Sequence, residues 1–387
     1  MSSLTTPVDA ARSLAPRIRA AADEIEAGRR LPPSLVREIA TAGLFRMCVP
    51  RSVGGAEVDP AAMVRAIEEV SRADGAAGWC VMIGATSGLV AAYLPEADAA
   101  EIYGRDPLVV TGGVFAPKGT AVTVDGGYRA SGRWAFASGC EHCAWLMGGC
   151  LVTDGGNPVS LPGGMPDSRM MLVPAAEARI HDTWTVSGLR GTGSHDIEVA
   201  DVFVPKGRSV SLVSDRPRER GSLYAFPVFG LLALGIAAVA TGIARSALEE
   251  LVELAGGKVP TGGRRRLADR GVTQAETAQA EAMLRSARAF LFDAVGECWE
   301  AARREGAIPI PERAHLRLAA TNAAITAARA VDVAYNAGGG TSIYQSSLLQ
   351  RHFRDVHVVT QHMMVSPSTY ELVGRILLGV EAEVSML

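Results

Sequence analysis

The sequence predicts an α+β protein in which a helical segment, a β-rich segment and a longer helical segment follow one another. Three observations predict this order. Met63, Ile67 and Val70 recur at helical spacing after Asp59-Pro60. Asp125-Gly126-Gly127 stands between two runs of β-prone residues. After residue 210, long apolar or amphipathic stretches dominate. Because strands and helices do not alternate, this order argues against a doubly wound nucleotide-binding fold.

The first predicted domain covers residues 1–108 and is helical. Asp59 is a predicted N-cap, and Pro60 suits the first helical position because an N–H there would lack a partner in any case. Upstream, Ser34 predicts the N-cap of another helix and Gly43 the residue just past its end. The apolar stretch 78–95 predicts a further, buried helix.

The middle predicted domain covers residues 109–210 and is mainly β. Residues 120–124 and 128–133 flank the Asp-Gly-Gly turn and predict a hairpin. The segments 143–152, 168–174 and 197–205 are further strand candidates. In the last of these, apolar and polar residues nearly alternate, with one slip near Ala200.

The last predicted domain covers residues 211–387. It contains Tyr224–Ala244, a charge-free run with about the length of a membrane span. The run is rich in Ala and Gly, carries Pro227 near its start, and has no strong excess of Lys or Arg on either flank. We therefore expect the buried centre of a helical assembly and no association with a membrane.

Composition excludes several classes of protein. The 387 residues carry 38 Lys+Arg against 41 Asp+Glu, so the clustered positive charge that binds nucleic acid is not expected. A hydrophobic content of 48% with a net charge of -3 excludes intrinsic disorder. Six scattered cysteines fit reduced thiols rather than a disulfide framework, and the N-terminus shows no secretory signal. We expect a cytoplasmic protein.

Two glycine clusters are candidate anion-binding loops. Gly188–Ser194, which reads GLRGTGS, can present backbone N–H groups to an anion or can simply connect two strands, and spacing favours neither. Gly338–Ser342 poses a similar choice between a phosphate-binding turn and a helix cap. No GxGxxG segment follows a predicted strand, and no GxxxxGK[ST] motif is present.

Cysteine and histidine spacing predicts no metal site. Cys140 and Cys143, with His142 between them, lack the second ligand pair of a structural zinc site. His352, His357 and His362 stand five residues apart, not at the i, i+4 spacing of a helical metal site. Isolated histidines of this kind more often lie on the surface or in the core, and Ser138 in WAFASGC more often ends a strand. Composition and spacing alone therefore indicate no reaction.

Four segments together resemble one family. Leu31–Gly55, Gly127–Cys140, Trp184–Pro205 and the closing segment QRHFRDVHVVTQH resemble, in order, the signature segments of the acyl-CoA dehydrogenase superfamily. The resemblance covers nearly the whole chain. It implies an N-terminal helical domain, a middle β-barrel-like domain and a C-terminal four-helix bundle. It also implies a flavin between the last two domains, and a homotetramer whose bundles pack together.

The residues of the closing segment distinguish two branches of this family. An acyl-CoA dehydrogenase needs a carboxylate to remove the substrate α-proton. The resemblance places it either near Met363 or on the first C-terminal helix, and Tyr224–Ala244 contains none. Glu371 would need a different helical register to serve. Both expected bases are therefore missing, which leaves a dehydrogenase that uses FAD as the alternative interpretation, with a non-catalytic flavin-binding protein as a third.

WAFASGC, GLRGTGS and a histidine in the closing segment look instead like the flavin-dependent monooxygenases of this fold. The resemblance implies reduced flavin (FMN or FAD) supplied by a separate reductase, O2 that adds at flavin C4a, and a small or polycyclic organic substrate. It implies that Ser138 meets the flavin N5 edge and that His362 acts near the substrate. Further residues expected to bind the cofactor are Trp134, Gly139, Arg190, Thr192, Ser194, Gly339 and Gly340.

The sequence departs from the aromatic hydroxylases of that branch at one position. These enzymes carry a histidine about eight residues beyond the Trp of a Gly-Trp pair, where this chain has Thr86 or Ser87 after Trp79. A hydroxyl cannot replace imidazole as the base for a phenol. Either the substrate needs no deprotonation or another group performs it. The FAD contact signature of the family is also absent, although Arg264, Arg265 and Arg266 could meet phosphates.

Overall fold

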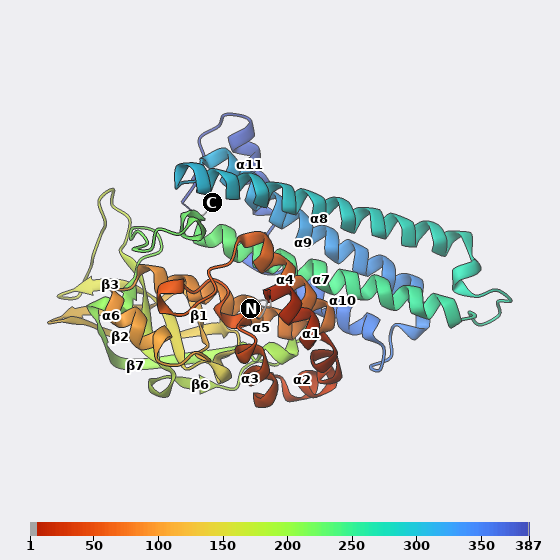
Figure 1. Ribbon diagram of the computed structural model, residues 1–387, viewed down its shortest axis with the longest axis horizontal. Coiled ribbons are helices and arrows are strands. Elements are labelled where there is room, and N and C mark those ends of the chain that lie inside the picture. The colour runs from red at the N-terminus through yellow and green to blue at the C-terminus, as the bar shows by residue number, and fades with distance from the viewer. Residues whose placement is uncertain (1–5, 386) are drawn as a thin grey trace, which may run out of the picture.

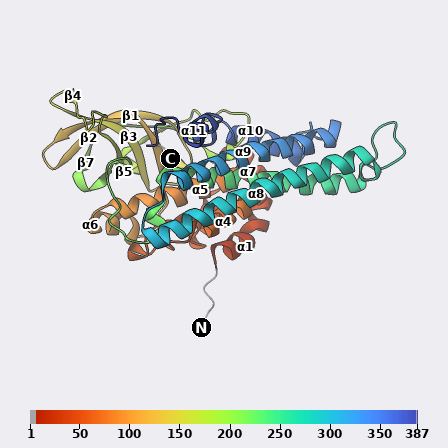
Figure 2. The same ribbon diagram turned by 90° about the horizontal axis from the view of Figure 1, so that it is seen from above.

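A computed structural model describes residues 6–385 and 387. Helices and a mixed sheet form three successive parts, with the sheet at one end of the molecule and the long helices reaching away from it (Figures 1 and 2). The first part is helical. Its elements are α1 (Pro7–Ala20), α2 (Ala22–Gly28), α3 (Pro33–Thr41), α4 (Pro60–Ala73), α5 (Gly75–Ser87) and the short α6 (Glu96–Ala99).

Helix caps in this part follow the sequence with one exception. The Asp59 carboxylate accepts a hydrogen bond from the Ala62 N–H at 2.8 Å, so the predicted cap of α4 is confirmed. Gly43 follows α3 with a φ of +74°, as expected beyond a helix end. The prediction for Ser34 is wrong. α3 begins at Pro33, whose fixed φ already suits a first helical position, and the Ser34 hydroxyl accepts from Arg17 instead.

The middle part is one sheet of eight strands. The strands are β1 (Thr111–Val124), β2 (Gly127–Ala137), β3 (Trp145–Asp154), β4 (Asn157–Pro158), β5 (Ser168–Pro174), β6 (Arg179–His181), β7 (His195–Pro205) and β8 (Ser209–Val210). Their order is β6-β7-β2-β1-β3-β5-β8, with β4 paired to β3. β1 runs parallel to β3 and antiparallel to β2.

Two details of the sheet follow from the sequence pattern. Val124 pairs with Gly127, so the hairpin predicted at Asp125-Gly126 is confirmed. The slip in alternation near Ala200 coincides with a register shift between β2 and β7, where Asp201 has a φ of +55°. An extra residue on one strand causes such a shift and keeps the apolar residues on both sides of it facing the core.

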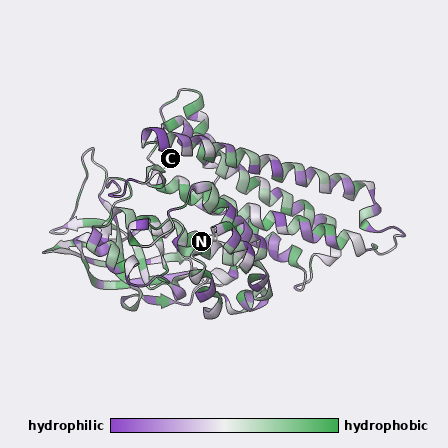
Figure 3. Ribbon diagram, in the orientation of Figure 1, coloured by the Kyte–Doolittle hydropathy of each residue, from purple (hydrophilic) through white to green (hydrophobic). Residues whose placement is uncertain are grey.

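The last part is helical. It contains α7 (Val228–Gly257), α8 (Gly271–Glu305), α9 (Ile310–Gly338), α10 (Leu348–Val359) and α11 (Ser368–Leu377). The expected first helix starts later than Tyr224, because Pro227 precedes α7 and residues 222–225 form a separate 3-10 turn. Hydrophobic residues run along α7, whereas the outer helix α8 carries many hydrophilic ones (Figure 3).

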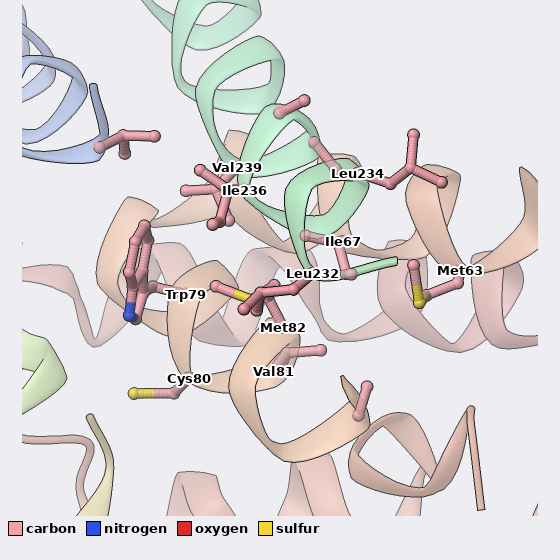
Figure 4. Close-up of a cluster of buried hydrophobic side chains, with 14 of the residues drawn as sticks. Met63, Ile67, Trp79, Cys80, Val81, Met82, Leu232, Leu234, Ile236 and Val239 are labelled. Atoms are coloured by element: carbon pink, nitrogen blue, oxygen red, sulfur yellow. The ribbon is translucent and has the colours of Figure 1, made fainter. Parts of the chain in front are cut away.

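In the part of the chain that the structure describes, two helical segments are long and apolar enough to cross a membrane by length and composition. Within an apolar 18-residue window of each segment, 94% of the residues in Gly75–Tyr93 and 89% of those in Val228–Gly257 are buried inside the protein. A core helix of a soluble protein passes the same test. The two segments pack against each other and against α4. Side chains of α4, α5 and α7, including Ile67, Met82 and Val239, form one cluster (Figure 4). A Cβ at Gly242 would lie 2.6 Å from the Glu68 carbonyl oxygen, so glycine there permits the close approach of α4 and α7.

Candidate active site

Ser138 stands at the point where β2 ends. The residue is 5% exposed, and its hydroxyl accepts a hydrogen bond from Trp79 Nε1 of α5 at 2.9 Å. The same hydroxyl lies 2.7 Å from the hydroxyl of Ser194. The chain then turns through Gly139, which has a φ of +69°. The serine predicted from its position at a strand end is therefore also the centre of a buried polar group.

The loop Gly188–Ser194 supplies the rest of this group. The Thr192 hydroxyl lies 2.6 Å from the Ser194 hydroxyl and 2.9 Å from the Leu189 carbonyl oxygen. The loop is tied to β2, because the Gly139 N–H donates to the Thr192 carbonyl at 2.8 Å. Thr192 and Ser194 are 2% and 3% exposed. The spacing left open whether this segment is an anion-binding loop or a connection between two strands. The structure shows a connection between strands that brings these hydroxyls to Ser138.

Two buried carboxylates hold the elements that meet at Ser138. Asp74 caps α5 by accepting from the Ala77 N–H at 2.8 Å, and α5 carries Trp79. Asp355 of α10 accepts from the Leu189 N–H at 2.6 Å and so anchors the Gly188–Ser194 loop. Burial raises the pKa of Asp74 to about 6 and that of Asp355 to about 7. Neither carboxylate was singled out in the sequence, because the partners lie far away along the chain.

His362 approaches the same place from the turn after α10. Its ring lies 5.8 Å from the Trp79 ring between centroids. Nδ1 accepts a hydrogen bond from the Met364 N–H at 3.2 Å. Burial, aided by the charge of Arg317, lowers the pKa of His362 to about 4. The histidine is therefore neutral at physiological pH, and because Nδ1 accepts, its proton resides on Nε2.

The structure places the aromatic side chains of β2 on different sides. Trp134 is 2% exposed, and its Nε1 donates to the Gly149 carbonyl at 2.8 Å inside the sheet. Phe136 is 71% exposed, has a φ of +68°, and packs edge-on against Trp184. Trp134 thus fills the sheet interior, and the exposed ring next to Ser138 belongs to Phe136. Pattern reasoning missed Phe136, and its position beside Ser138 in WAFASGC is the only signal for it.

The remaining predicted residues lie at varying distances from Ser138. Arg190 is half-buried in the Gly188–Ser194 loop, 3.7 Å from Glu26 between side-chain N and O. Gly339 and Gly340 are exposed in the turn after α9, at the end of the long helices opposite the sheet (Figures 1 and 2). Lys258 donates to the Gly338 carbonyl and the Thr341 hydroxyl there, both at 2.6 Å. One chain therefore does not bring these glycines to Ser138.

The positions that would carry the carboxylate of a dehydrogenase or the helix histidine of an aromatic hydroxylase hold no such base. Met363 is 64% exposed, Glu371 is exposed on α11, and α7 has no carboxylate before residue 249. On α5 the Thr86 hydroxyl donates to the Met82 carbonyl at 2.8 Å, and Ser87 is buried. Among residues 6–385 and 387 no group of three His, Cys, Asp or Glu side chains is arranged to hold a metal ion. Burial raises the pKa of Cys140 to about 12, so this thiol is inert at neutral pH.

Two cavities among the described residues are lined by neither Ser138 nor His362. A surface hollow of about 970 Å³ between α1 and α3 is lined by none of the predicted site residues. A smaller one of about 160 Å³ is lined by Asp74, Arg351, His352 and Asp355. The second adjoins the carboxylates that hold α5 and the Gly188–Ser194 loop, whereas the first lies away from them.

Comparison with known proteins identifies the family. The descriptions "acyl-CoA dehydrogenase, N-terminal domain" and "acyl-CoA dehydrogenase, C-terminal domain" match residues 8–97 and 234–367. The indole-3-acetate monooxygenase of Pseudomonas putida is 36% identical over 365 residues, which cover 94% of this chain and 91% of that protein. The chain belongs to the flavin-dependent monooxygenases of the acyl-CoA dehydrogenase superfamily. The monooxygenase interpretation is thereby confirmed over the dehydrogenase alternative.

Other monooxygenases of this family agree along the whole chain. The oxygenase subunit HsaA of Mycobacterium tuberculosis is 30% identical over 363 residues, covering 92% of this chain and 90% of that protein. Its crystal structure superposes with a TM-score of 0.90 over 99% of both chains, at 29% identity. XiaF from Streptomyces sp., in complex with FADH2 and glycerol, has a TM-score of 0.89 at 28% identity and covers 98% of this chain and 96% of its own.

Buried histidines make the stability of this monooxygenase depend on pH. Burial, with the charge of Arg351, lowers the pKa of His352 to about 4. In the unfolded chain His352 is protonated as pH falls below about 6.5, whereas in the folded chain it stays neutral down to about pH 4. The free energy of unfolding therefore decreases as pH falls from 6.5 to 4. Asp74 and Asp355 act with the opposite sign, since their folded-state pKa values are raised.

His352→Gln should therefore reduce the slope of unfolding free energy against pH by about one proton, roughly 1.4 kcal/mol per pH unit, between pH 4.5 and 6. Urea unfolding of both proteins at several pH values measures this slope. Parallel curves for the variant and the original chain would show that His352 does not carry the effect.

Proposed function

We propose that the chain is the oxygenase component of a two-component system, which takes reduced flavin from a separate reductase and adds one atom of O2 to an aromatic substrate. The observation that carries this proposal is the buried group at Ser138. There the Ser138 hydroxyl meets the loop Gly188–Ser194, and a neutral His362 lies beside the Trp79 ring that donates to Ser138, while the positions of a dehydrogenase carboxylate hold none. The HsaA and resorcinol hydroxylase relatives are themselves described as oxygenase components.

The residues at Ser138 fit a flavin ring. Phe136 offers an exposed aromatic face beside Ser138, and we assign to it the ring contact that the sequence suggested for Trp134. The Ser138 hydroxyl faces the N5 edge in this proposal, with Gly139, Arg190, Thr192 and Ser194 around it. When bound, reduced flavin supplies the electrons that activate O2. The surrounding apolar side chains exclude water, which protects reactive oxygen species from wasteful breakdown.

His362 holds a proton near the substrate in this proposal. Its Nε2–H is a donor, because Nδ1 is occupied by the Met364 N–H. A pKa of about 4 keeps the ring neutral over the whole physiological range. A neutral imidazole can donate one proton and accept another without first being titrated, which suits proton exchange during oxygen transfer.

The substrate that fits best is an electron-rich ring that reacts without deprotonation, such as an indole. The hydroxyl of Thr86 is occupied by the Met82 carbonyl, so α5 offers no base for a phenol. The indole-3-acetate monooxygenases of Pseudomonas putida and Acinetobacter baumannii are 36% and 34% identical to this chain. A pyrrole-type ring is already nucleophilic when neutral, whereas a phenol gains much of its reactivity on ionisation.

Residues at the end of the long helices opposite the sheet support a homotetramer. Gly339, Gly340 and Lys258 lie there together with the exposed Arg264–Arg266 segment. Such groups suit a flavin phosphate, and within one chain they lie at the end of the long helices opposite the sheet (Figure 1). We therefore place them against the flavin of a neighbouring subunit in a homotetramer. All six cysteines are buried free thiols, which is consistent with a cytoplasmic enzyme.

The purified chain tests the proposal directly. Reduced FMN or FAD, supplied chemically and then mixed with O2, should convert a member of a panel of indoles and other small aromatic acids to an oxygenated product. Acyl-CoA compounds, mixed with the oxidised flavoprotein without O2, should leave the flavin absorbance unchanged. Bleaching by any acyl-CoA would contradict the proposal, and so would the absence of flavin binding in both redox states.

A further inference from the structure

The hydroxyl of Thr192 donates its proton to the Leu189 carbonyl oxygen. It lies 2.9 Å from the Leu189 carbonyl oxygen, and a carbonyl can only accept. The same carbonyl also receives the Trp184 Nε1–H at 3.1 Å and the Thr192 N–H at 3.1 Å, which are likewise donors. Two oxygens at 2.9 Å without a proton between them would repel. Thr192 therefore donates to Leu189.

The direction of the next two hydrogen bonds follows by counting protons. Since the Thr192 proton is used, its contact with Ser194 at 2.6 Å requires Ser194 to donate. Ser194 then has no proton left, so its contact with Ser138 at 2.7 Å requires Ser138 to donate. Trp79 Nε1 donates to Ser138 at 2.9 Å. Ser138 thus has its proton and one lone pair occupied, and a single lone pair remains.

Burial protects this direction from reversal. The three residues are between 2% and 5% exposed, so bulk water does not supply their hydroxyls with an alternative partner. The Leu189 carbonyl from which the direction starts is itself held in place. Its residue has a φ of +49°, and its N–H donates to the Asp355 carboxylate at 2.6 Å. A hydroxyl chain with one fixed end has one direction throughout.

We propose that Thr192 and Ser194 fix Ser138 as a hydrogen-bond acceptor and thereby make the site select reduced flavin over oxidised flavin. This inference rests on the proposed function, in which Ser138 faces flavin N5. N5 of reduced flavin carries a hydrogen and donates, whereas N5 of oxidised flavin has only a lone pair and accepts. An acceptor at Ser138 therefore pairs with the reduced state and opposes the oxidised one. An oxygenase fed by a separate reductase needs this preference, because the oxidised product must leave.

The dissociation constants of oxidised and reduced FMN and FAD, measured without O2, test the proposal. The original chain should bind the reduced state more tightly. In Thr192→Val, Ser194 loses its acceptor and turns toward Ser138, which frees the Ser138 proton to point at N5. The ratio of the oxidised to the reduced dissociation constant should fall about threefold to tenfold. Ser194→Ala frees the same proton and should act in the same direction.

Two controls separate direction from mere structural damage. Thr192→Ser keeps the hydroxyl and should keep the ratio. Thr277→Val removes a hydroxyl that donates to the Thr273 carbonyl at 2.8 Å on α8, and it should also keep the ratio. A structural defect weakens the binding of both redox states together and leaves the ratio unchanged.

The outcomes distinguish this inference from the proposed function. An unchanged or increased ratio in both Thr192→Val and Ser194→Ala, with flavin still bound, would overturn the inference and leave the proposed function standing. If the original chain bound flavin in neither state, the proposed function itself would fail. If one variant failed to fold, the other would still decide the question.

Discussion

His362→Ala is expected to lower the rate of substrate oxygenation by about 10²–10⁴-fold, the usual cost of removing an acid–base group. Reduced flavin should still bind and still react with O2, but most turnovers should release hydrogen peroxide instead of product. The physical reason is the Nε2–H donor of a neutral, half-buried imidazole, which no neighbouring group replaces in the proposed site. Product and peroxide, measured together per flavin oxidised, check this expectation.

Two further variants sharpen the His362 experiment. His362 also caps a short turn through the Met364 N–H, so alanine should cost about 1 kcal/mol of stability as well. His362→Asn keeps an acceptor for that N–H but has no group that exchanges protons, and it should lose oxygenation to a similar degree. His357→Ala removes a surface histidine that pairs with Asp332 at 2.8 Å and should keep full coupling. Normal coupling in both His362 variants would return this residue to a structural role.

Ser138→Ala is expected to divert roughly nine-tenths or more of the oxidised flavin to peroxide, because a lost hydrogen bond at N5 is worth about a factor of ten. It also leaves the buried Trp79 Nε1–H without a partner, which should cost about 1–3 kcal/mol of unfolding free energy. Ser138→Thr retains a hydroxyl and should restore much of the coupling. Peroxide yield and urea unfolding measure the two effects separately.

A matched serine on the same strand provides the control. Ser131 of β2 accepts a hydrogen bond from the Asp201 N–H at 2.8 Å on the exposed side of the sheet. Ser131→Ala should leave the yield of product per flavin unchanged. If Ser138→Ala also left that yield unchanged, Ser138 would be only a partner of Trp79.

Local chemistry explains what the sequence could predict of the fold. The Asp125-Gly126 turn and the Asp59 cap depend on residues within a few positions of one another, and both predictions are confirmed. The prediction for Ser34 is wrong because the preceding proline starts the helix two residues earlier than a cap at Ser34 would. The slip near Ala200 was visible as a break in alternation, although only the paired strand shows it to be a register shift.

The site was harder to predict because its contacts are distant in sequence. Trp79 and Ser138 are hydrogen-bonded although 59 positions separate them in the sequence, and Asp355 and Leu189 are 166 positions apart. No local sequence pattern therefore predicts either pair. Alternation alone would place Trp134 and Phe136 on one face of β2. The positive φ of Phe136, within a register shift between Trp134 and Ala137, turns the second ring outward. Ser138 and His362 were reached through family resemblance and not through spacing.

In the proposed function, this chain transfers an oxygen atom from O2 to an aromatic substrate by means of reduced flavin. A single turnover of the purified chain with chemically reduced flavin, an indole substrate and ¹⁸O2 in ordinary water measures this transfer most directly. We expect one ¹⁸O atom in the product, detected by mass spectrometry. Product that carries only oxygen from water, or peroxide without product across the whole aromatic panel, would contradict it.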